Sequence, residues 1–234
     1  MQKSFKFAVT VGRNENADLE KIAQIWAEKF NVKYVERGSK GSLKFLLDQE
    51  QVDALLVATN QGPQVYSASG TFFFHPSMAV LRAQRLKKHE PDHFVAALEL
   101  KPGMKVLDCT MGLASDAIVA SFITGAEGVV CAVEASPLLH FVVSEGLKNY
   151  QAEDIDLNSA MRRITTVCAE AETYLAALPT DSFDVVYFDP MFRIPVNGSS
   201  NMEPLRPLAW EKALTAEMVE AALRAAPCVV IKER

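Results

Sequence analysis

The sequence predicts an α/β fold, with a parallel sheet in its C-terminal part and a smaller α/β domain before it. Strand-like runs alternate with helical stretches after residue 101, which is the pattern of a parallel sheet. These runs are apolar throughout, as expected for strands buried on both faces. Hydrophobic residues make up 49% and charged residues 23% of the 234 residues, which is ordinary globular composition with enough apolar surface for a sizeable core. We therefore expect a Rossmann-like sheet over residues 101–234.

The N-terminal domain is expected to span residues 1–75. Residues 5–11 alternate in polarity and predict a strand, and residues 17–30 have the apolar spacing of a helix. Further short apolar runs predict four more strands, with one helix between the first two. These strands are expected at 32–35, 54–58, 64–68 and 71–74, and the helix at 42–50. Nothing here has catalytic spacing, so this part does not indicate what it binds.

Residues 76–100 are expected to form a helical connector, in which Pro76 suits a helix start and Pro91 separates two helices. Lys101-Pro102-Gly103 predicts a turn into the C-terminal domain. Strands are expected there at 104–109, 128–133, 164–168, 184–188 and 228–232, and helices at about 115–124, 137–149, 171–178 and 215–225. Doubly wound sheets often continue beyond a fifth strand, so we expect either a short version of the sheet or a longer natural chain.

Composition and charge exclude several classes of protein. The formal net charge of −5 argues against a general nucleic-acid binder, although a local basic face could still bind RNA. No apolar run approaches the roughly 20 residues of a membrane helix, and the N-terminus turns polar too soon for a signal peptide. No pair of cysteines has CxxC spacing, so we expect no metal site and predict buried, reduced thiols in a cytoplasmic protein. The cysteines are Cys109, Cys131, Cys168 and Cys228.

Carboxylates lie at the carboxyl ends of four of the predicted parallel strands. They are Asp108, Glu134, Glu170 and Asp189, and Asp116 adds another at the start of a helix. Each alone could be a cap or turn residue, as Ser136-Pro137 also is for the helix at 137–149. Because ligands bind beyond the carboxyl ends of parallel strands, all of them are expected at one ligand-binding edge.

The first loop, after Asp108, does not suit a phosphate. A dinucleotide needs G-x-G-x-x-G, whereas this loop offers only Gly112, with Ala114 at the next small position, and no GxxxxGK[ST] motif occurs. Asp116 would repel a pyrophosphate. A cofactor with positive charge, S-adenosylmethionine (SAM), fits better: acids near the loop can hold its ammonium, Glu134 can accept its ribose hydroxyls, and Glu170 its adenine amine.

Three runs resemble a known family. VLDCTMGLASDAIVAS (106–121), VEASP (133–137) and VVYFDPMF (185–192) are similar to class I SAM-dependent methyltransferases, and most similar to the 16S rRNA guanine-N2 methyltransferase J family. In this chain Ala114 replaces a family glycine, Glu170 replaces a small polar residue, and residues 193–210 replace a lysine-rich loop. The resemblance implies a SAM pocket lined by Ser115, Asp116, Glu134, Ala135, Glu170, Ala171 and Asp189.

The D-P-M-F run is also similar to the [DN]-P-P-[YF] motif of enzymes that methylate exocyclic amines. An aryl amine is a poor nucleophile because its lone pair is delocalised into the ring. Asp189 and the carbonyl of Pro190 could accept its N–H groups and direct the lone pair at the methyl group, while Phe192 stacks on the extruded base. Asp189 could instead orient only the methionyl end of SAM, and Phe192 could be a core aromatic residue.

Basic residues that could bind RNA lie mainly in the connector. They are Arg82, Arg85, Lys87 and Lys88, with Arg162, Arg163 and Arg193 elsewhere, and His75 is a further substrate-side candidate. A solvated helix face is the alternative for these residues. The expected function is methylation of an exocyclic amine of a base in RNA, by resemblance guanine N2 of rRNA. A methyltransferase of a small molecule or DNA, and a non-catalytic SAM-binding regulator, are the alternatives.

Overall fold

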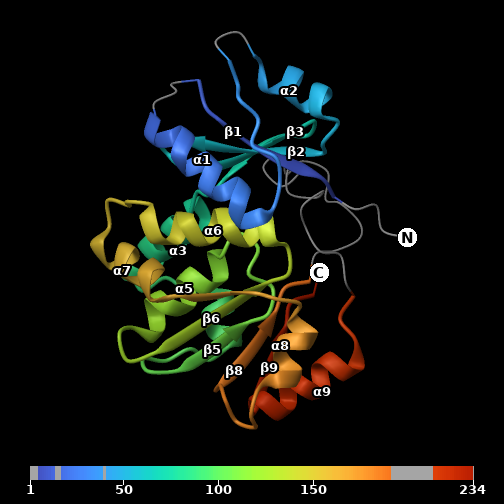
Figure 1. Ribbon diagram of the computed structural model, residues 1–234. Helices are drawn as coiled ribbons and strands as arrows, with labels where there is room; N and C mark the ends of the chain where they lie inside the picture. The colour runs from blue at the N-terminus through green and yellow to red at the C-terminus, as the bar shows by residue number, and fades with distance from the viewer. Residues whose placement is uncertain (1–4, 14–16, 39–40, 191–212, 234) are drawn as a thin grey trace. The chain divides into compact units, whose positions relative to one another are not determined.

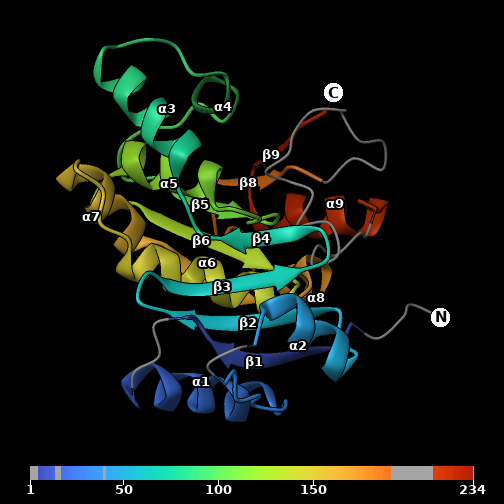
Figure 2. The same cartoon turned by 90° about the horizontal axis from the view of Figure 1, so that it is seen from above.

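The computed structural model describes residues 5–13, 17–38, 41–190 and 213–233. The chain divides into two compact units, and the division falls between Phe74 and His75. Figures 1 and 2 show the elements of each unit. No helix within the described ranges is both long and apolar enough to cross a membrane.

The first unit is a four-stranded sheet with two helices. The strands of the sheet lie in the order β1-β2-β3-β4. β1 and β2 are parallel, whereas β2, β3 and β4 form an antiparallel meander. The predicted strand at 32–35 is wrong, because Tyr34 makes only an isolated bridge to Val9. The elements are β1 (Phe7–Val11), α1 (Ala17–Phe30), α2 (Leu43–Glu50), β2 (Ala54–Thr59), β3 (Gly62–Ser67) and β4 (Gly70–Phe73).

The second unit is built on a parallel sheet of five strands in the order β7-β6-β5-β8-β9. The chain moves from β5 outward to β7, then returns to the other side of β5 for β8 and β9. The strand order therefore reverses between β5 and β8, which is where open α/β sheets bind ligands. The strands are β5 (Lys105–Asp108), β6 (Val129–Glu134), β7 (Thr165–Cys168), β8 (Val185–Phe188) and β9 (Cys228–Ile231).

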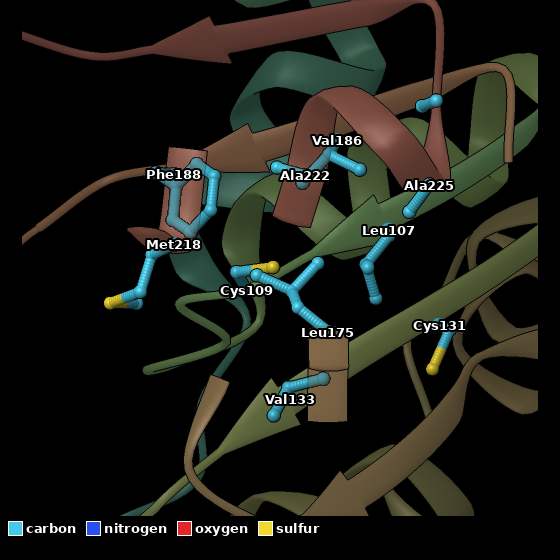
Figure 3. Close-up of a cluster of buried hydrophobic side chains, with 11 residues drawn as sticks. Leu107, Cys109, Cys131, Val133, Leu175, Val186, Phe188, Met218, Ala222 and Ala225 are labelled. Carbon is cyan, nitrogen blue, oxygen red and sulfur yellow. The ribbon is translucent and has the colours of Figure 1, made fainter. Parts of the chain in front are cut away.

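Helices cover both faces of this sheet (Figure 1). α8 and α9 lie on one face, where Leu175 of α8 and Met218 of α9 pack on Leu107, Val133 and other strand residues (Figure 3). α5, α6 and α7 pack together on the other face, and α3 and α4 pack on α5, so the predicted connector helices lie within the second unit. These helices are α3 (Ser77–Lys87), α4 (His93–Ala97), α5 (Ser115–Thr124), α6 (Pro137–Asn149), α7 (Ile155–Arg163), α8 (Ala171–Ala177) and α9 (Ala216–Ala225).

Local sequence signals explain most helix boundaries. Ser136 caps α6 by accepting from the backbone N–H of Leu139, with Pro137 at the first helical position, as predicted. The helix α7 was not expected from the sequence. It is short and mostly polar, although Leu157, Ala160 and Met161 are buried at helical spacing, and Asp154 caps it by accepting from the N–H groups of Asp156 and Leu157.

Two of the four cysteines correct the expectation that all are buried. Cys131 in β6 and Cys109, which directly follows β5, are buried, but Cys168 and Cys228 are exposed. Both belong to the outermost strands, β7 and β9, which have a neighbouring strand on one side only. None of the four forms a disulfide within the described residues.

Candidate functional site

The site is built at the carboxyl edge, which we define as the last residues of β5, β6, β7, β8 and β9 together with the loops and helix starts that follow these strands. Side chains alternate along a strand, and Leu107, Val133 and Phe188 point toward α8 and α9. Asp108 and Glu134, each one position away from these residues, therefore point toward the face that carries α5. The sheet thus brings two acidic side chains to one face at one edge.

Asp108 is connected to Asp189 through Thr110. The backbone N–H of Thr110 donates to Asp108 Oδ1 at 2.9 Å, and the Thr110 hydroxyl lies 3.3 Å from the same oxygen. The backbone N–H of Asp189 in turn donates to Thr110 Oγ1 at 2.7 Å. This chain of hydrogen bonds ties the ends of β5 and β8 together at the point where the strand order reverses.

Burial has a clear effect on Asp108. Its side chain is 2% exposed, and desolvation raises its pKa to about 7, in spite of the hydrogen bond from Thr110. The charges of Asp116 and Asp189 act in the same direction. These carboxylates are therefore close enough to repel one another.

Glu134 holds the backbone of two loops. Its Oε2 accepts from the N–H of Gly112 at 3.2 Å, and its Oε1 accepts from the N–H of Ser136 at 2.9 Å. Burial raises the pKa of Glu134, while these hydrogen bonds favour the charged form. A carboxylate oxygen can accept more than one hydrogen bond, so Glu134 keeps capacity for ligand hydroxyls.

The first loop has a left-handed backbone. Gly112 has φ +48°, and a Cβ built there would meet only the carbonyl oxygen of Thr110, at 3.8 Å. Ala114, which replaces the family glycine, has φ +59° and is fully buried. The backbone thus keeps at Ala114 a conformation that glycine adopts more easily.

Asp116 is held by other side chains of the protein. Its Oδ1 accepts from Arg82 Nη1 at 2.5 Å, and its Oδ2 accepts from the hydroxyl of Tyr187 at 3.0 Å. Arg82 also binds both carboxylate oxygens of Asp92, at 2.7 and 2.9 Å, and lies over the ring of Phe94. The network joins α3, the cap of α4, α5 and β8.

Asp189 is paired with Lys232, the residue that directly follows β9. Lys232 Nζ lies 2.6 Å from Asp189 Oδ2, and the two side chains are 47% and 31% exposed. The backbone N–H of Lys232 donates to the carbonyl of Phe188 at 2.8 Å, which continues the pairing of β8 with β9. Asp189 and Lys232 are therefore neighbours across the sheet.

The other predicted cofactor residues are also near strand ends. Ser115 is the first residue of α5, Ala135 directly follows β6, and Ala171 begins α8. Glu170 is the N-cap residue of α8, although its side chain makes no capping hydrogen bond. The backbone N–H of the residue before it, Ala169, donates to the carbonyl of Glu134.

Most of the predicted RNA-binding residues contact other parts of the protein. Arg85 pairs with Glu90, and Lys87 pairs with Asp154 and Asp156. His75 Nε2 lies 3.2 Å from the hydroxyl of Tyr150.

The pair Arg162 and Arg163 is not a free basic patch. Arg162 donates to the carbonyls of Leu147 and Tyr150, and Arg163 donates to the carbonyl of Ser121. Of the predicted catalytic residues, Pro190 directly follows Asp189 and is partly buried. Phe192 and Arg193 lie outside the described residues.

Sequence reasoning missed three residues of this site. They are Thr110, Tyr187 and Lys232, which contact Asp189, Asp116 and Asp189 respectively. Only Lys232 had a usable signal, because it is a polar residue directly after an apolar strand. Thr110 and Tyr187 become recognisable only through their contacts.

The chemistry of this edge suits SAM. Asp108 and Glu134 pair with no cation among the described residues, so a sulfonium or an ammonium group would gain from their charge. The open backbone at Gly112 permits close approach of a ligand. No cluster of His, Cys, Asp and Glu in the described ranges could hold a metal ion.

Comparison with known proteins agrees with this geometry. Residues 29–233 match the family described as "Putative SAM-dependent methyltransferase". "Uncharacterized protein YpiP" of Bacillus subtilis (strain 168) is 37% identical over 215 residues, which cover 91% of this chain and 83% of that protein. The SAM-dependent methyltransferase NGO1261 of Neisseria gonorrhoeae has the same fold, with a TM-score of 0.63 at 15% identity, over 97% of this chain and 84% of that chain.

Relatives with a more specific name match a shorter part. Ribosomal RNA small subunit methyltransferase J of Rhodopseudomonas palustris (strain HaA2) is 31% identical over 151 residues, which are 62% of this chain and 65% of that protein. The corresponding protein of Dechloromonas aromatica (strain RCB) is 30% identical, over 59% of this chain and 57% of that protein. The chain thus spans less than two thirds of these J proteins. The fold, the acidic carboxyl edge and the family match together show that this chain belongs to the SAM-dependent methyltransferases and uses SAM as its cofactor.

Proposed function

We propose that this methyltransferase modifies an exocyclic amine of a base in RNA, and that the target is guanine N2 of small-subunit ribosomal RNA. The observation that carries the proposal is the place of Asp189, which lies on the D-P-M-F run at the end of β8 and is tied to Asp108 through Thr110. The ribosomal RNA methyltransferases named above support the substrate class. Such a substrate would make the cytoplasm the place of action.

In this proposal the protein speeds the reaction mainly by aligning the acceptor amine with the methyl group of SAM. SAM, when bound, supplies a methyl group on a positively charged sulfur. Asp108 and Glu134 provide the negative charge that holds the cofactor, and Glu170 accepts from its adenine amine. Ser115, Asp116, Ala135 and Ala171 complete the cofactor contacts.

The acceptor amine is held by groups that can only accept hydrogen bonds. The Asp189 carboxylate and the Pro190 carbonyl accept its two N–H groups, so that its lone pair points toward the methyl group. Phe192, which lies outside the described residues, would by the resemblance stack on the base once the base has left its helix. The activation barrier of methyl transfer depends on this alignment. Loss of one hydrogen-bond acceptor should therefore slow methyl transfer far more than it weakens binding of the substrate.

The test uses Asp189→Ala with Asp184→Asn as a matched control. Asp184 precedes β8 at the opposite edge of the sheet and accepts from the N–H of Lys105, which asparagine can preserve. We expect Asp189→Ala to slow methyl transfer to small ribosomal subunits by at least about 100-fold, with SAM affinity within a few fold of the wild type. Asp184→Asn should transfer at the wild-type rate.

The product is identified by mass spectrometry of nucleosides from small-subunit RNA of cells with and without the gene. N2-methylguanosine that disappears with the gene supports the full proposal. An unchanged set of modified nucleosides, or full activity of Asp189→Ala, contradicts it.

A small-molecule acceptor is the second candidate, and one observation favours it. The candidate RNA-binding residues Arg82, Arg85 and Lys87 are engaged with acidic side chains of the protein, and the net charge is −5. RNA that binds through phosphates loses affinity steeply with salt. Binding to small-subunit RNA fragments is therefore measured at two salt concentrations. An RNA methyltransferase should bind these fragments more weakly at the higher concentration, whereas a small-molecule methyltransferase should bind them at neither concentration.

A further inference from the structure

We propose that Lys232 is a positioning residue for methyl transfer, which holds one oxygen of the Asp189 carboxylate so that the other oxygen, Oδ1, faces the acceptor amine. The proposal rests on the proposed function of Asp189. It adds a residue that lies far from the methyltransferase motifs in the sequence.

The first argument is geometric. Lys232 Nζ contacts only one oxygen of Asp189, Oδ2, at 2.6 Å. The other oxygen, Oδ1, has no hydrogen-bond partner among the residues that the structure describes. The backbone of Asp189 is fixed separately, through its N–H and Thr110 Oγ1. The ion pair therefore removes the rotational freedom of the side chain and leaves one acceptor for a substrate N–H.

The second argument concerns charge. Asp108, Asp116 and Asp189 interact electrostatically, and all three would carry like charges when ionised. Repulsion among them would turn the most exposed carboxylate, Asp189, toward solvent. Lys232 opposes this repulsion at Asp189, as Arg82 does at Asp116.

The third argument concerns stability. Exposed ion pairs of this kind stabilise a fold only slightly, since solvent screens the charges and two long side chains lose freedom. Lys232 and Asp189 are both partly exposed. The contribution of the pair is therefore expected in the alignment of Asp189 rather than in the stability of the sheet.

The test compares Lys232→Met, Lys232→Arg and a control, Lys148→Met. Lys148 pairs with Glu145 near the end of α6, and because a helix that follows a parallel strand runs back along the sheet, this pair lies at the opposite edge. Steady-state methylation of small ribosomal subunits is measured with saturating SAM. We expect Lys232→Met to lower kcat by about 10- to 100-fold with KM for RNA within about twofold. Lys232→Arg should recover most of kcat, and Lys148→Met should match the wild type.

A second measurement does not depend on activity. Lysine ammonium groups are observed by ¹H–¹⁵N correlation spectra, in which the Lys232 signal is assigned by its absence in Lys232→Met. We expect Asp189→Asn to shift or broaden this signal and Asp184→Asn to leave it unchanged.

The outcomes separate the two proposals. A wild type that methylates no RNA overturns the proposed function, whereas the spectra still report whether Lys232 is bound to Asp189. An active wild type with unchanged kcat in Lys232→Met overturns the positioning role. A raised KM that depends on salt, with kcat unchanged, also overturns it, because Lys232 would then contact RNA phosphates directly.

Discussion

The carboxylates of the carboxyl edge fall into two groups, which differ in how the protein balances their charge. Asp108 and Glu134, at the ends of β5 and β6, are buried, and no cation among the described residues pairs with either. Burial raises the pKa of both groups. In the absence of ligand their charged forms are therefore costly.

The second group is already balanced. Asp116 is bound by Arg82, and Asp189 is bound by Lys232. We propose separate roles for the two groups. A cationic cofactor would gain most beside the unbalanced Asp108 and Glu134, whereas Asp189 would orient the acceptor amine and Asp116 would add a cofactor contact.

The largest effect is expected from Asp108→Asn, which keeps an acceptor for Thr110 but removes the ionisable group. The pKa of Asp108 is raised from 3.8 to about 7, so between these values the folded protein holds a proton that the unfolded chain has released. Stability of the wild type therefore falls as pH rises through this window. The variant lacks this pH dependence, so its free energy of unfolding should rise relative to that of the wild type by about 4 kcal/mol across the window.

Urea denaturation at several pH values measures this difference. Asp184→Asn, at the opposite edge, should keep the pH dependence of the wild type. A difference between Asp108→Asn and wild type that does not change with pH would show that Asp108 titrates as an ordinary aspartate, and the two groups of acids would not be distinct.

A slightly smaller effect is expected from Glu134→Gln, which keeps the shape of the side chain. The variant loses the charge and presents an amide NH₂ to one of the N–H groups of Gly112 and Ser136. SAM affinity should fall about 30-fold, or about 2 kcal/mol. Titration calorimetry measures the affinity, with Glu145→Gln at a partly exposed position of α6 as control. Equal affinities for wild type and Glu134→Gln would mean that the unbalanced acids are not the cofactor site.

Removing the cation that pairs with Asp116 tests the second group of acids. Arg82→Met leaves Asp92 and Asp116 without their partner and should lower stability by about 1–2 kcal/mol, since the pairs are partly buried. The hydrogen bond from Arg82 lowers the pKa of Asp92, so this loss should shrink as pH falls through that pKa. Thermal denaturation measures it. SAM affinity should not fall, and a large drop in affinity at full stability would reverse the assigned roles.

The smallest effect is expected from Lys33→Met in the first unit. Lys33 pairs with Glu50 at 2.7 Å, but its side chain is 65% exposed. Stability should change by no more than about 0.5 kcal/mol. A loss as large as that of Arg82→Met would show that an exposed pair is as important as a partly buried one, and burial would no longer explain the difference.

Much of the fold was predictable because it follows local patterns. The apolar runs that became β5, β6 and β8 and the cap at Ser136 are contained in short stretches of sequence. α7 was missed because it is short and mostly polar, so that its apolar face of Leu157, Ala160 and Met161 is easily overlooked in the sequence. The strand at 32–35 was predicted wrongly, because this segment runs beside β1 but pairs with it only around Val9, through a single bridge at Tyr34 that is too short to count as a strand.

The acidic edge itself was determined by the sequence alone, because parallel strands separated by helices must all end on the same side of the sheet. Only the tertiary structure decided which of these acids pair with a cationic side chain. Arg82 and Asp116 are 34 positions apart, and Asp189 and Lys232 are 43 apart. The partner of a charged side chain over such distances depends on how helices and strands pack, and no local pattern encodes it.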